Sequence, residues 1–418
     1  MRKTLLILVM VVLLSVGMLT SAIWAQDAIT IRMWTWFDDF QTAFPKIVEK
    51  WNTAHPDIRV EQQIFSLNEY LQKLQAAVAG GSEPDIFGPH VMVRSLGEAG
   101  VSLDLNQYLD EEFLSRFTPG TIRQFTWNGH LYSLPWTAQT FGIFYNKDIF
   151  ARMGLKIPET WDELIETSHT IRAMDSSIQP LPFGNRDKWL GCDFFLPLIT
   201  QVTDDPTLVL DLDRRLNPER KVSWNSEPVI EALRLVEKLV KEEVFAPGIN
   251  GLAYDQSLTM FYMGKGAMFY CGSWLPVTID REAPEGFNWD VFETPAYAPG
   301  KRHWTGNESG ANLAISARSK HIKETIEFLK FMYSPEVYTE AMIEARGMPA
   351  MPEILAGLEN PIVKKMASWL KDGAPHILYG EGSWDAVANA VQGLMGGQLT
   401  PEEAAAQIEN DVQRARSR

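Results

Sequence analysis

Aromatic rings and carboxylates stand side by side in the segment IRMWTWFDDF. Trp34, Trp36 and Phe37 are followed at once by Asp38 and Asp39. Carboxylates are costly to bury beside rings unless another group pairs or hydrogen-bonds them. A ring offers a flat apolar surface, and a carboxylate accepts hydrogen bonds. A site that carries both suits a ligand with an apolar face and a rim of hydroxyl groups, which is the chemistry of a sugar.

The same combination of aromatic and polar side chains recurs in five later segments, which are NRDKW, GCDFF, GSW, HWTGNES and GSWDAV. The chain also holds 14 tryptophans against 11 tyrosines, although tryptophan is normally the rarer of the two. The supply of tryptophan therefore agrees with a site that presents several flat rings to its ligand.

An alternation of strands and helices has to position these segments. Residues 29–34 alternate as a strand does, residues 40–51 repeat apolar side chains at helical spacing, and the strand IRVEQQ follows. A further helix and the short strand PDIFGPH come next. This order is typical of an α/β sheet, in which ligands bind at the carboxyl ends of the strands. The aromatic and acidic segment stands at such an end.

Later elements can also be predicted from local patterns. Segments of the form Ser/Thr-x-x-Glu predict capped helix starts at Ser66, Thr160 and Thr400. Residues 226–244 repeat apolar side chains as a helix does, and GKGAMFYCG and ANLAIS predict buried strands. Because no linker rich in Pro, Gly or Ser occurs, we expect strands to join the two domains that the length allows.

Residues 1–25 have the features of an export signal. Arg2 and Lys3 precede an apolar run, and small residues precede Gln26, so we predict cleavage after Ala25. A membrane anchor is the alternative, because the apolar run approaches spanning length. The lack of a basic stop-transfer flank favours removal. No cysteine stands at the predicted cut, so we expect no lipid anchor and a periplasmic or extracellular protein.

The charge of the chain argues against polyanionic partners. Residues 26–418 carry 36 basic and 53 acidic residues, a formal charge of −17. This charge disfavours nucleic acid and anionic lipid as partners. Cys192 and Cys271 are too few for a disulfide scaffold and lack zinc-ligand spacing. They form either one bridge or two buried thiols.

The order and spacing of several segments resemble a known family, the extracellular solute-binding proteins that deliver sugars to ATP-driven bacterial importers and are related to maltose-binding protein. The resemblance covers essentially the whole chain after the signal. The segments are YLQKLQAAVAGGSEPDIF, WNGHLYSLPWTAQTFGIFYNKDIFARMGLKIPETWDEL, FYMGKGAMFYCGSW, GANLAISARSK with FLKFMYSPE, and RGMPA.

The resemblance implies a two-lobed α/β clamp of type II, each lobe a sheet flanked by helices, with the ligand cleft between the lobes. The chain would cross between the lobes in LPWTAQTF, near HWTGNES and near RGMPAMP. One lobe would comprise 27–137 and 306–347, and the other 138–305 and 348–418. The implied protein is a monomer without cofactor or metal that captures a mono- or oligosaccharide by lobe closure and presents it to the permease subunits of an importer.

The resemblance also implies ligand contacts. Trp274 and Trp384 match the family's aromatic platforms, and Gln139 matches a polar contact on the crossing strand. The full set of expected ligand-binding residues is Trp36, Asp38, Asp39, His90, Trp136, Gln139, Asp193, Phe194, Trp274, Trp304, Glu308, Arg346 and Trp384.

Each of these residues also has a structural interpretation. We expect one of Asp38 and Asp39 to cap the following helix and the other to face the ligand. His90 either reaches the ligand or packs. Glu308 and Arg346 either bind a hydroxyl or tie the hinge. Trp161 differs from the other tryptophans, because its spacing with Leu164, Ile165 and Ile171 places it on a core face.

Two other functions use similar chemistry. A secreted glycoside hydrolase also lines its cleft with rings and carboxylates. No motif singles out a catalytic pair, however, and no G-x-S-x-G, H-E-x-x-H or P-loop pattern occurs. A binding protein for a non-sugar solute, such as a glycerol phosphodiester or an organic acid, is the other alternative. The charge of −17 makes an anionic ligand less favoured than a neutral sugar.

Overall fold

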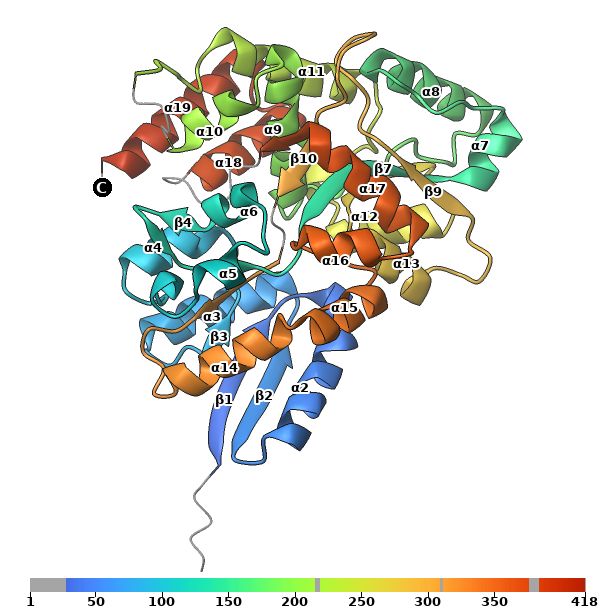
Figure 1. Cartoon of the computed structure of the whole chain (residues 1–418). Coiled ribbons are helices and arrows are strands. Elements are labelled where there is room, and N and C mark those ends of the chain that lie inside the picture. Colours follow the sequence, from blue (N-terminus) through green and yellow to red (C-terminus); the bar gives the residue numbers. More distant parts are fainter. Residues whose placement is uncertain (1–27, 215–218, 309–310, 376–382, 418) are drawn as a thin grey trace, which may run out of the picture.

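The computed structural model describes residues 28–417 except 215–218, 309–310 and 376–382 (Figure 1). The predicted export signal at 1–25 lies outside the described residues. Two five-stranded sheets, with helices packed around each, make up most of the described chain. We call the part built on the first sheet lobe I and the part built on the second sheet lobe II.

Sheet I has the strand order β2-β1-β3-β11-β6. β1 pairs in parallel with β2 and β3, and β11 runs antiparallel to β3 and β6. In β1, Ile31 and Met33 are buried while Arg32 is exposed, so this strand alternates as predicted. The carboxyl end of β1 leads directly into Trp36. The strands are β1 (Ile29–Thr35), β2 (Ile58–Ile64), β3 (Ile86–Phe87), β6 (Leu134–Pro135) and β11 (Asn312–Ile315).

Helices cover sheet I through one apolar face each. In α2 (Ala43–Ala54) the buried residues include Phe44, Ile47 and Trp51, which recur at helical spacing. This face packs against β2 and against two late helices, α14 (Ile322–Met332) and α15 (Pro335–Glu344). The predicted helix therefore exists, although a separate 3-10 turn, η1 (Asp38–Phe40), precedes it.

Sheet II has the order β12-β10-β7-β8, with β9 beside β7. β7 is the central strand, and it runs antiparallel to β8, β9 and β10. All residues of β8 are buried, so the strand predicted in GKGAMFYCG is confirmed. The strands are β7 (Gln139–Asn146), β8 (Met268–Gly272), β9 (Trp289–Phe292), β10 (Thr305–Glu308) and β12 (Gly373–Pro375).

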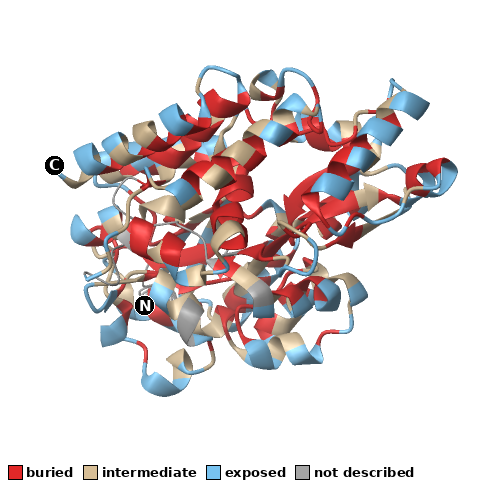
Figure 2. Ribbon diagram, turned by 90° about the horizontal axis from the view of Figure 1, so that it is seen from above, coloured by how far each residue is buried: buried red, intermediate tan, exposed pale blue. Residues whose placement is uncertain are grey.

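A central helix carries much of the core of lobe II. α9 (Trp189–Thr203) is buried from Leu190 to Gln201, as expected for a helix enclosed on all sides. It packs against α11 (Glu227–Lys241) and α18 (Ser383–Met395), and α19 (Pro401–Arg416) packs against both of those helices. Seen from above, buried residues run through the middle of the molecule and exposed residues lie on the outer helices (Figure 2).

The described chain passes between the two sheets three times. β6 in sheet I is followed by β7 in sheet II, and β10 in sheet II is followed by β11 in sheet I. The third passage lies beside the first, because Thr137 and Pro349 form an antiparallel bridge. β10 extends to Glu308, so the backbone of 306–308 belongs to sheet II.

The remaining elements complete the two lobes. The further helices and strands are α3 (Leu67–Ala79), α4 (Val93–Glu98), α5 (Glu111–Leu114), α6 (Pro119–Gln124), β4 (Thr126–Trp127), β5 (His130–Leu131), α7 (Lys147–Met153), α8 (Trp161–Met174), α10 (Pro206–Arg214), α12 (Tyr254–Tyr262), α13 (Leu275–Glu282), α16 (Pro352–Gly357) and α17 (Pro361–Ser368). The further 3-10 turns are η2 (His90–Met92), η3 (Leu105–Gln107), η4 (Ile249–Gly251) and η5 (Trp369–Asp372).

Two of the three predicted helix caps form. The Thr400 hydroxyl accepts a hydrogen bond from the backbone nitrogen of Glu403, and the Glu403 carboxylate accepts one from the backbone nitrogen of Thr400. Thr160 accepts from the backbone of Glu163 in the same way. Ser66 occupies the cap position of α3 but makes no capping hydrogen bond with its side chain. The predicted side-chain cap at Ser66 was therefore wrong, although the helix begins where expected.

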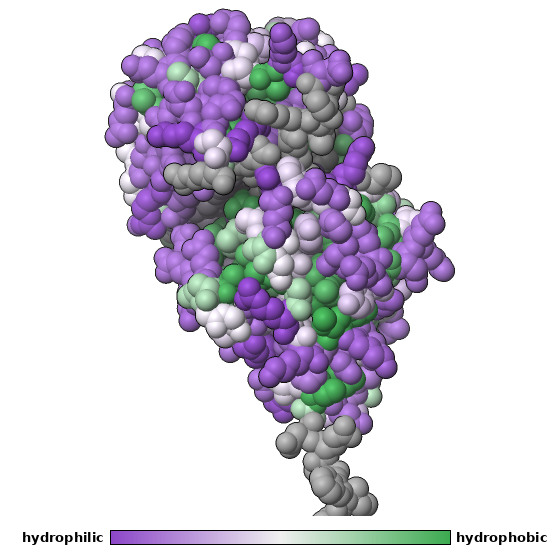
Figure 3. Space-filling view, turned by 90° about the vertical axis from the view of Figure 1, so that its left-hand side faces the viewer, coloured by the Kyte–Doolittle hydropathy of each residue, from purple (hydrophilic) through white to green (hydrophobic). Residues whose placement is uncertain are grey.

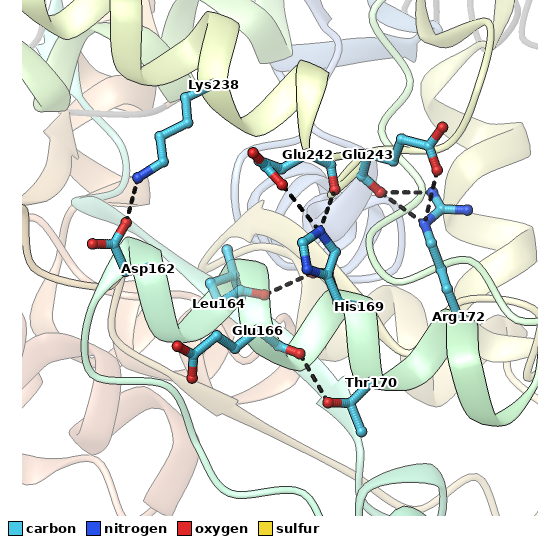
Figure 4. A network of polar contacts seen from close by, with 10 residues as sticks. Asp162, Leu164, Glu166, His169, Thr170, Arg172, Lys238, Glu242 and Glu243 are labelled. Carbon is cyan, nitrogen blue, oxygen red and sulfur yellow. Dashed lines mark hydrogen bonds and ion pairs between the residues drawn. The ribbon is translucent and has the colours of Figure 1, made fainter.

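Hydrogen bonds and an ion pair join α8 to α11 and to the segment that follows it in lobe II. Arg172 on α8 donates from Nε and Nη2 to the Glu243 carbonyl, at 2.9 and 2.6 Å (Figure 4). Its Nη2 also donates to the Phe245 carbonyl at 3.1 Å. Lys238 on α11 lies 2.6 Å from Asp162 on α8. These contacts join α8 to the end of α11, so they have a structural role.

The two lobes differ in the residues that they present on one face of the molecule. In the view of Figure 3, hydrophobic residues gather over the lower lobe, which is lobe I, and the upper lobe is mainly hydrophilic. Within the described residues, no helix combines the length and the apolarity that crossing a membrane requires.

Candidate functional site

On lobe I, Trp36 lies where β1 ends and stands among other aromatic rings. It is only partly buried. The ring centroids of Phe37, Tyr70 and His90 lie 4.7, 5.1 and 5.1 Å from that of Trp36. His90 follows the carboxyl end of the neighbouring strand β3. The sheet therefore brings two predicted site residues together, because the ends of adjacent parallel strands meet at one edge.

Asp38 and Asp39 differ from the expectation. Neither caps a helix, since neither η1 nor α2 has a side-chain cap. Asp38 Oδ2 instead accepts from Arg281 Nη2 of α13 at 2.6 Å. Gln41 completes this contact when its amide oxygen faces Arg281, at 2.5 Å from Nη1. Asp38 is therefore held by a cation of lobe II, and sequence patterns do not reveal a partner 243 positions away.

Asp39 lies in a different environment. Burial raises the pKa of Asp39 to about 7, and the charge of Asp38 acts in the same direction. A backbone hydrogen bond and the charge of Arg281 oppose this rise. Near neutral pH, Asp39 can therefore donate a hydrogen bond in one protonation state and accept one in the other.

On lobe II, Trp274 follows β8 and lies at its carboxyl end, only partly buried. Its indole Nε1 donates to Tyr254 Oη at 3.3 Å. Its ring is edge-on to Phe141, with centroids 5.3 Å apart, and the Trp189 centroid lies 6.0 Å away. The ring centroids of Trp189 and Tyr254 lie 5.0 Å apart.

Trp189 and Tyr254 were not among the predicted site residues. NRDKW, which contains Trp189, has the same aromatic and polar composition as the other segments and could have identified it. Tyr254 begins α12 and gave no comparable signal. Its hydroxyl lies 3.2 Å from the Cys271 thiol. Cys192 and Cys271 are both buried and form no disulfide, which decides the alternative left open by the sequence in favour of two thiols.

Three of the contacts between side chains of the two lobes lie near these rings. The centroids of His90 and Trp384 lie 6.3 Å apart. Asn68 Nδ2 on α3 donates to Asp187 Oδ1 at 3.4 Å. The third contact is the ion pair of Asp38 with Arg281 described above. We call the region bounded by these contacts the interlobe face, and the rings of Trp36 and Trp274 border it from opposite lobes.

Asp193 lies deeper in lobe II. It is 3% exposed, and burial raises its pKa well above the usual range. The hydroxyl of Tyr270, on β8, donates to the Asp193 backbone carbonyl at 3.0 Å. Burial likewise raises the pKa of the Cys271 thiol to about 12. Burial therefore disfavours the charged form of both groups, which belong to the interior of lobe II.

Three predicted site residues lie in the cores. Trp136 is fully buried in lobe I, where its ring packs against those of Tyr333 and Tyr338. Phe194 packs within lobe II against Trp161, Phe183, Phe245 and Tyr270. Trp304 is 5% exposed, and its Nε1 donates to Asp204 at 2.6 Å. The structure does not bring these three rings to the interlobe face.

The residues predicted near the connections lie where the chain passes between the sheets. Gln139 begins β7, and its backbone pairs with that of Glu308 in β10. Arg346 follows α15 in lobe I and forms an ion pair with Asp280 of α13 in lobe II. This contact favours the hinge-tying interpretation of Arg346. Trp161, predicted as a core residue, is confirmed at 1% exposure, with Nε1 donating to Gln201 at 2.8 Å.

The chemistry at the interlobe face is that of binding. It combines aromatic rings from both lobes with the carboxylates of Asp38 and Asp187, and carboxylates can accept hydrogen bonds from the hydroxyl groups of a ligand. In the described part of the chain, no group of three or more His, Cys, Asp or Glu residues is arranged to hold a metal ion.

Comparison with known proteins identifies the family of this chain. A family model described as bacterial extracellular solute-binding protein matches residues 34–339. A multiple sugar-binding protein of Streptococcus mutans is 25% identical over 322 residues, which cover 73% of this chain and 71% of that protein. A melibiose/raffinose/stachyose-binding protein of Bacillus subtilis is 23% identical over 421 residues, which cover 95% of this chain and 92% of that protein.

A solved structure shows the same fold. The GacH receptor of Streptomyces glaucescens, determined without ligand and with acarbose, has a TM-score of 0.80 at 21% identity. The match covers 93% of this chain and 98% of that chain. The two-lobed α/β clamp expected from the sequence is therefore confirmed.

Proposed function

The chain belongs to the family of bacterial extracellular solute-binding proteins, and on that basis we propose that it captures a carbohydrate between its lobes and delivers it to an ABC importer. The observation that carries the proposal is the pairing of aromatic rings across the interlobe face. Trp36 and His90 come from lobe I, while Trp274 and Trp384 come from lobe II. Sugar rings stack on such side chains, and closure gives a ligand both sets of contacts.

The charge around these rings favours a neutral ligand. Burial raises the pKa of Asp255, and so do the charges of Asp187, Glu282 and Asp38, while the charge of Arg186 opposes this rise. A phosphodiester or an organic acid would add a further negative charge to this region. The related proteins named above include binders of melibiose, raffinose and stachyose and a receptor solved with acarbose. Their names support a carbohydrate as the ligand.

We propose that five of the predicted residues contact the ligand. They are Trp36, Asp39, His90, Trp274 and Trp384. The lobe ranges proposed for closure are 27–137 with 309–347 and 138–308 with 348–418, because the backbone of 306–308, expected in lobe I, pairs within sheet II. The crossing strands near 136–140 and 303–308 are the proposed bending points.

The test is calorimetric titration and thermal melting with raffinose, stachyose, acarbose and a glycerol phosphodiester. We expect at least one carbohydrate to bind and to stabilise the protein, by about 2.7 kcal/mol at 100 times its Kd. Binding of the phosphodiester alone would overturn the assignment to carbohydrates. Binding of none of these compounds would count against the choice of ligand class.

The proposal includes the absence of catalysis. The family consists of binding proteins, and a hydrolase would need two carboxylates placed on either side of one glycosidic bond. Incubation with stachyose and measurement of released sugars tests this point. Release above the level in a blank without protein would favour the hydrolase.

We also propose that the protein acts outside the cytoplasm as a monomer and partners permease subunits in the membrane. Removal of residues 1–25, without lipid attachment, is part of this proposal. The intact mass of the exported protein should correspond to a chain beginning at Gln26. A mass that includes residues 1–25 or acyl chains would contradict it.

A further inference from the structure

Two glycines at the interlobe face are enclosed by tryptophan rings. Gly88 directly follows β3, and Gly272 is the last residue of β8. A Cβ atom added to Gly88 would lie 2.9 Å from Cη2 of Trp36 and closer still to Cζ3. A Cβ atom added to Gly272 would lie well within 3.0 Å of three ring atoms of Trp274. Real Cβ atoms essentially never approach so closely.

The reason for glycine at these positions is space and not backbone conformation. Neither Gly88 nor Gly272 has a positive φ, so both backbones are open to other residues. Each glycine instead leaves room for an indole to lie over the end of a strand. One such arrangement stands on each lobe, and the two rings border the same interlobe face.

A tyrosine hydroxyl secures each arrangement. Tyr70 Oη lies 2.8 Å from both the backbone nitrogen and the carbonyl oxygen of Gly88, and its ring is 5.1 Å from that of Trp36. Tyr254 Oη accepts from Trp274 Nε1 at 3.3 Å. In lobe II the indole nitrogen is therefore engaged inside the protein, which leaves the apolar ring surface as the group available for stacking.

From this geometry we propose that Gly88 and Gly272 are positioning residues of the ligand site. Each sets the orientation of one tryptophan so that its ring can stack on a ligand from its own lobe. This inference rests on the proposed function, and it adds the residues that determine how the two aromatic surfaces are presented. Any side chain at either glycine would push the ring away from the strand end.

The test uses Gly88→Ala and Gly272→Ala, with Gly357→Ala as the matched control. Gly357 at the end of α16 has no positive φ and no atom within 4 Å of an added Cβ. With raffinose and acarbose as probes, we expect each positioning variant to weaken binding at least tenfold in Kd. The control should bind as the parent protein does.

A double variant separates positioning from ordinary packing. Trp274→Leu removes the ring that an added Cβ at Gly272 would strike. Gly272→Ala should therefore lower the melting temperature of the parent but have little effect in the Trp274→Leu background. The double variant should still bind the probe weakly. Rescue of stability without rescue of affinity is the signature of a positioning role.

The outcomes distinguish this inference from the proposed function. If the parent binds neither probe, the carbohydrate assignment has failed on those probes. The melting temperatures then still decide whether Gly272 and Trp274 are coupled. Equal losses of melting temperature from Gly272→Ala in both backgrounds would overturn the inference. So would a parent that binds the probe together with glycine variants that bind it equally well.

Discussion

At the scale of single residues, Trp161 and Trp274 form a natural pair for comparison. Trp161 is a core residue at 1% exposure, whereas Trp274 is partly buried at the interlobe face. Trp274→Ala should weaken ligand binding by about 1.5–3 kcal/mol, the value of burying a large apolar side chain. This corresponds to about ten- to a hundredfold in Kd. Calorimetric titration of the variant measures the effect.

The control reverses the two effects. Trp161→Ala should reduce the free energy of unfolding by about 3–5 kcal/mol and leave the affinity of the folded protein nearly unchanged. Melting both variants completes the comparison. If Trp274→Ala binds as the parent does and melts far earlier, Trp274 serves the core and not the ligand.

Asp39 predicts a pH dependence of stability. Its pKa is raised to about 7 in the folded protein, above the ordinary value of 3.8. Between about pH 4 and about pH 7 the folded state therefore binds a proton that the unfolded state lacks, and the free energy of unfolding falls as the pH rises. Asp39→Asn should flatten this fall. Chemical denaturation at several pH values measures it.

Asp175→Asn is the control for this experiment. Hydrogen bonds from Ser177 lower the pKa of Asp175, so its contribution has the opposite sign and is lost as the pH falls. That variant should keep the fall in stability between about pH 4 and about pH 7. An Asp39→Asn protein with the same pH profile as the parent would show that Asp39 does not hold this proton.

At the scale of elements, Arg172 tests the junction of α8 and α11. Its guanidinium satisfies the carbonyl of Glu243, a residue with a φ of +52°, and that of Phe245. Arg172→Ala should lower the free energy of unfolding by about 1.5–3 kcal/mol, the usual value for hydrogen bonds to a charged group. Ligand affinity should not change, because this network lies outside the interlobe face. Denaturant melts and titrations provide both measurements.

Lys238→Ala is the matched control on the same surface. The Lys238 and Asp162 side chains are 50% and 75% exposed, so their ion pair is worth about 1 kcal/mol or less. A larger loss for Lys238→Ala than for Arg172→Ala would show that the carbonyl contacts do not hold the junction.

At the scale of the whole molecule, α13 holds the lobes together through two neighbouring charges. Arg281 pairs with Asp38 of lobe I, and Asp280 pairs with Arg346 of lobe I. Arg281→Ala and Arg346→Ala should each make the ligand-free protein more open. Each variant loses an ion pair that can form only when the two lobes are close together. Partly exposed pairs contribute about 0.2–1 kcal/mol, so Kd should rise by no more than about fivefold.

Small-angle scattering without ligand, together with titration, checks this prediction. Arg234→Ala is the control, because Arg234 pairs with Glu227, Glu231 and Glu402 within lobe II. The exchanged pair Asp38→Arg with Arg281→Asp should restore the parent radius. An unchanged radius in both single variants would show that α13 does not hold the lobes.

Local sequence patterns were sufficient to predict several of the helices and strands. The alternation of β1, the buried strand β8, the apolar face of α11 and the cap at Thr400 all depend on residues close in sequence. Trp161 could be assigned to the core in the same way, because its neighbours on α8 share its apolar face. For such features the interacting residues lie within one or two turns of each other.

Other features depended on where distant segments meet. Trp136 and Trp274 look alike in sequence, yet one packs in a core and the other borders the interlobe face. Asp38 pairs with Arg281, and Trp274 contacts Tyr254 and Trp189, although these partners are at least 20 positions away in the sequence. The sequence by itself therefore determined the elements, the family and the kind of chemistry. The tertiary structure decided which rings and carboxylates share a site, because pairings between distant segments leave no local pattern.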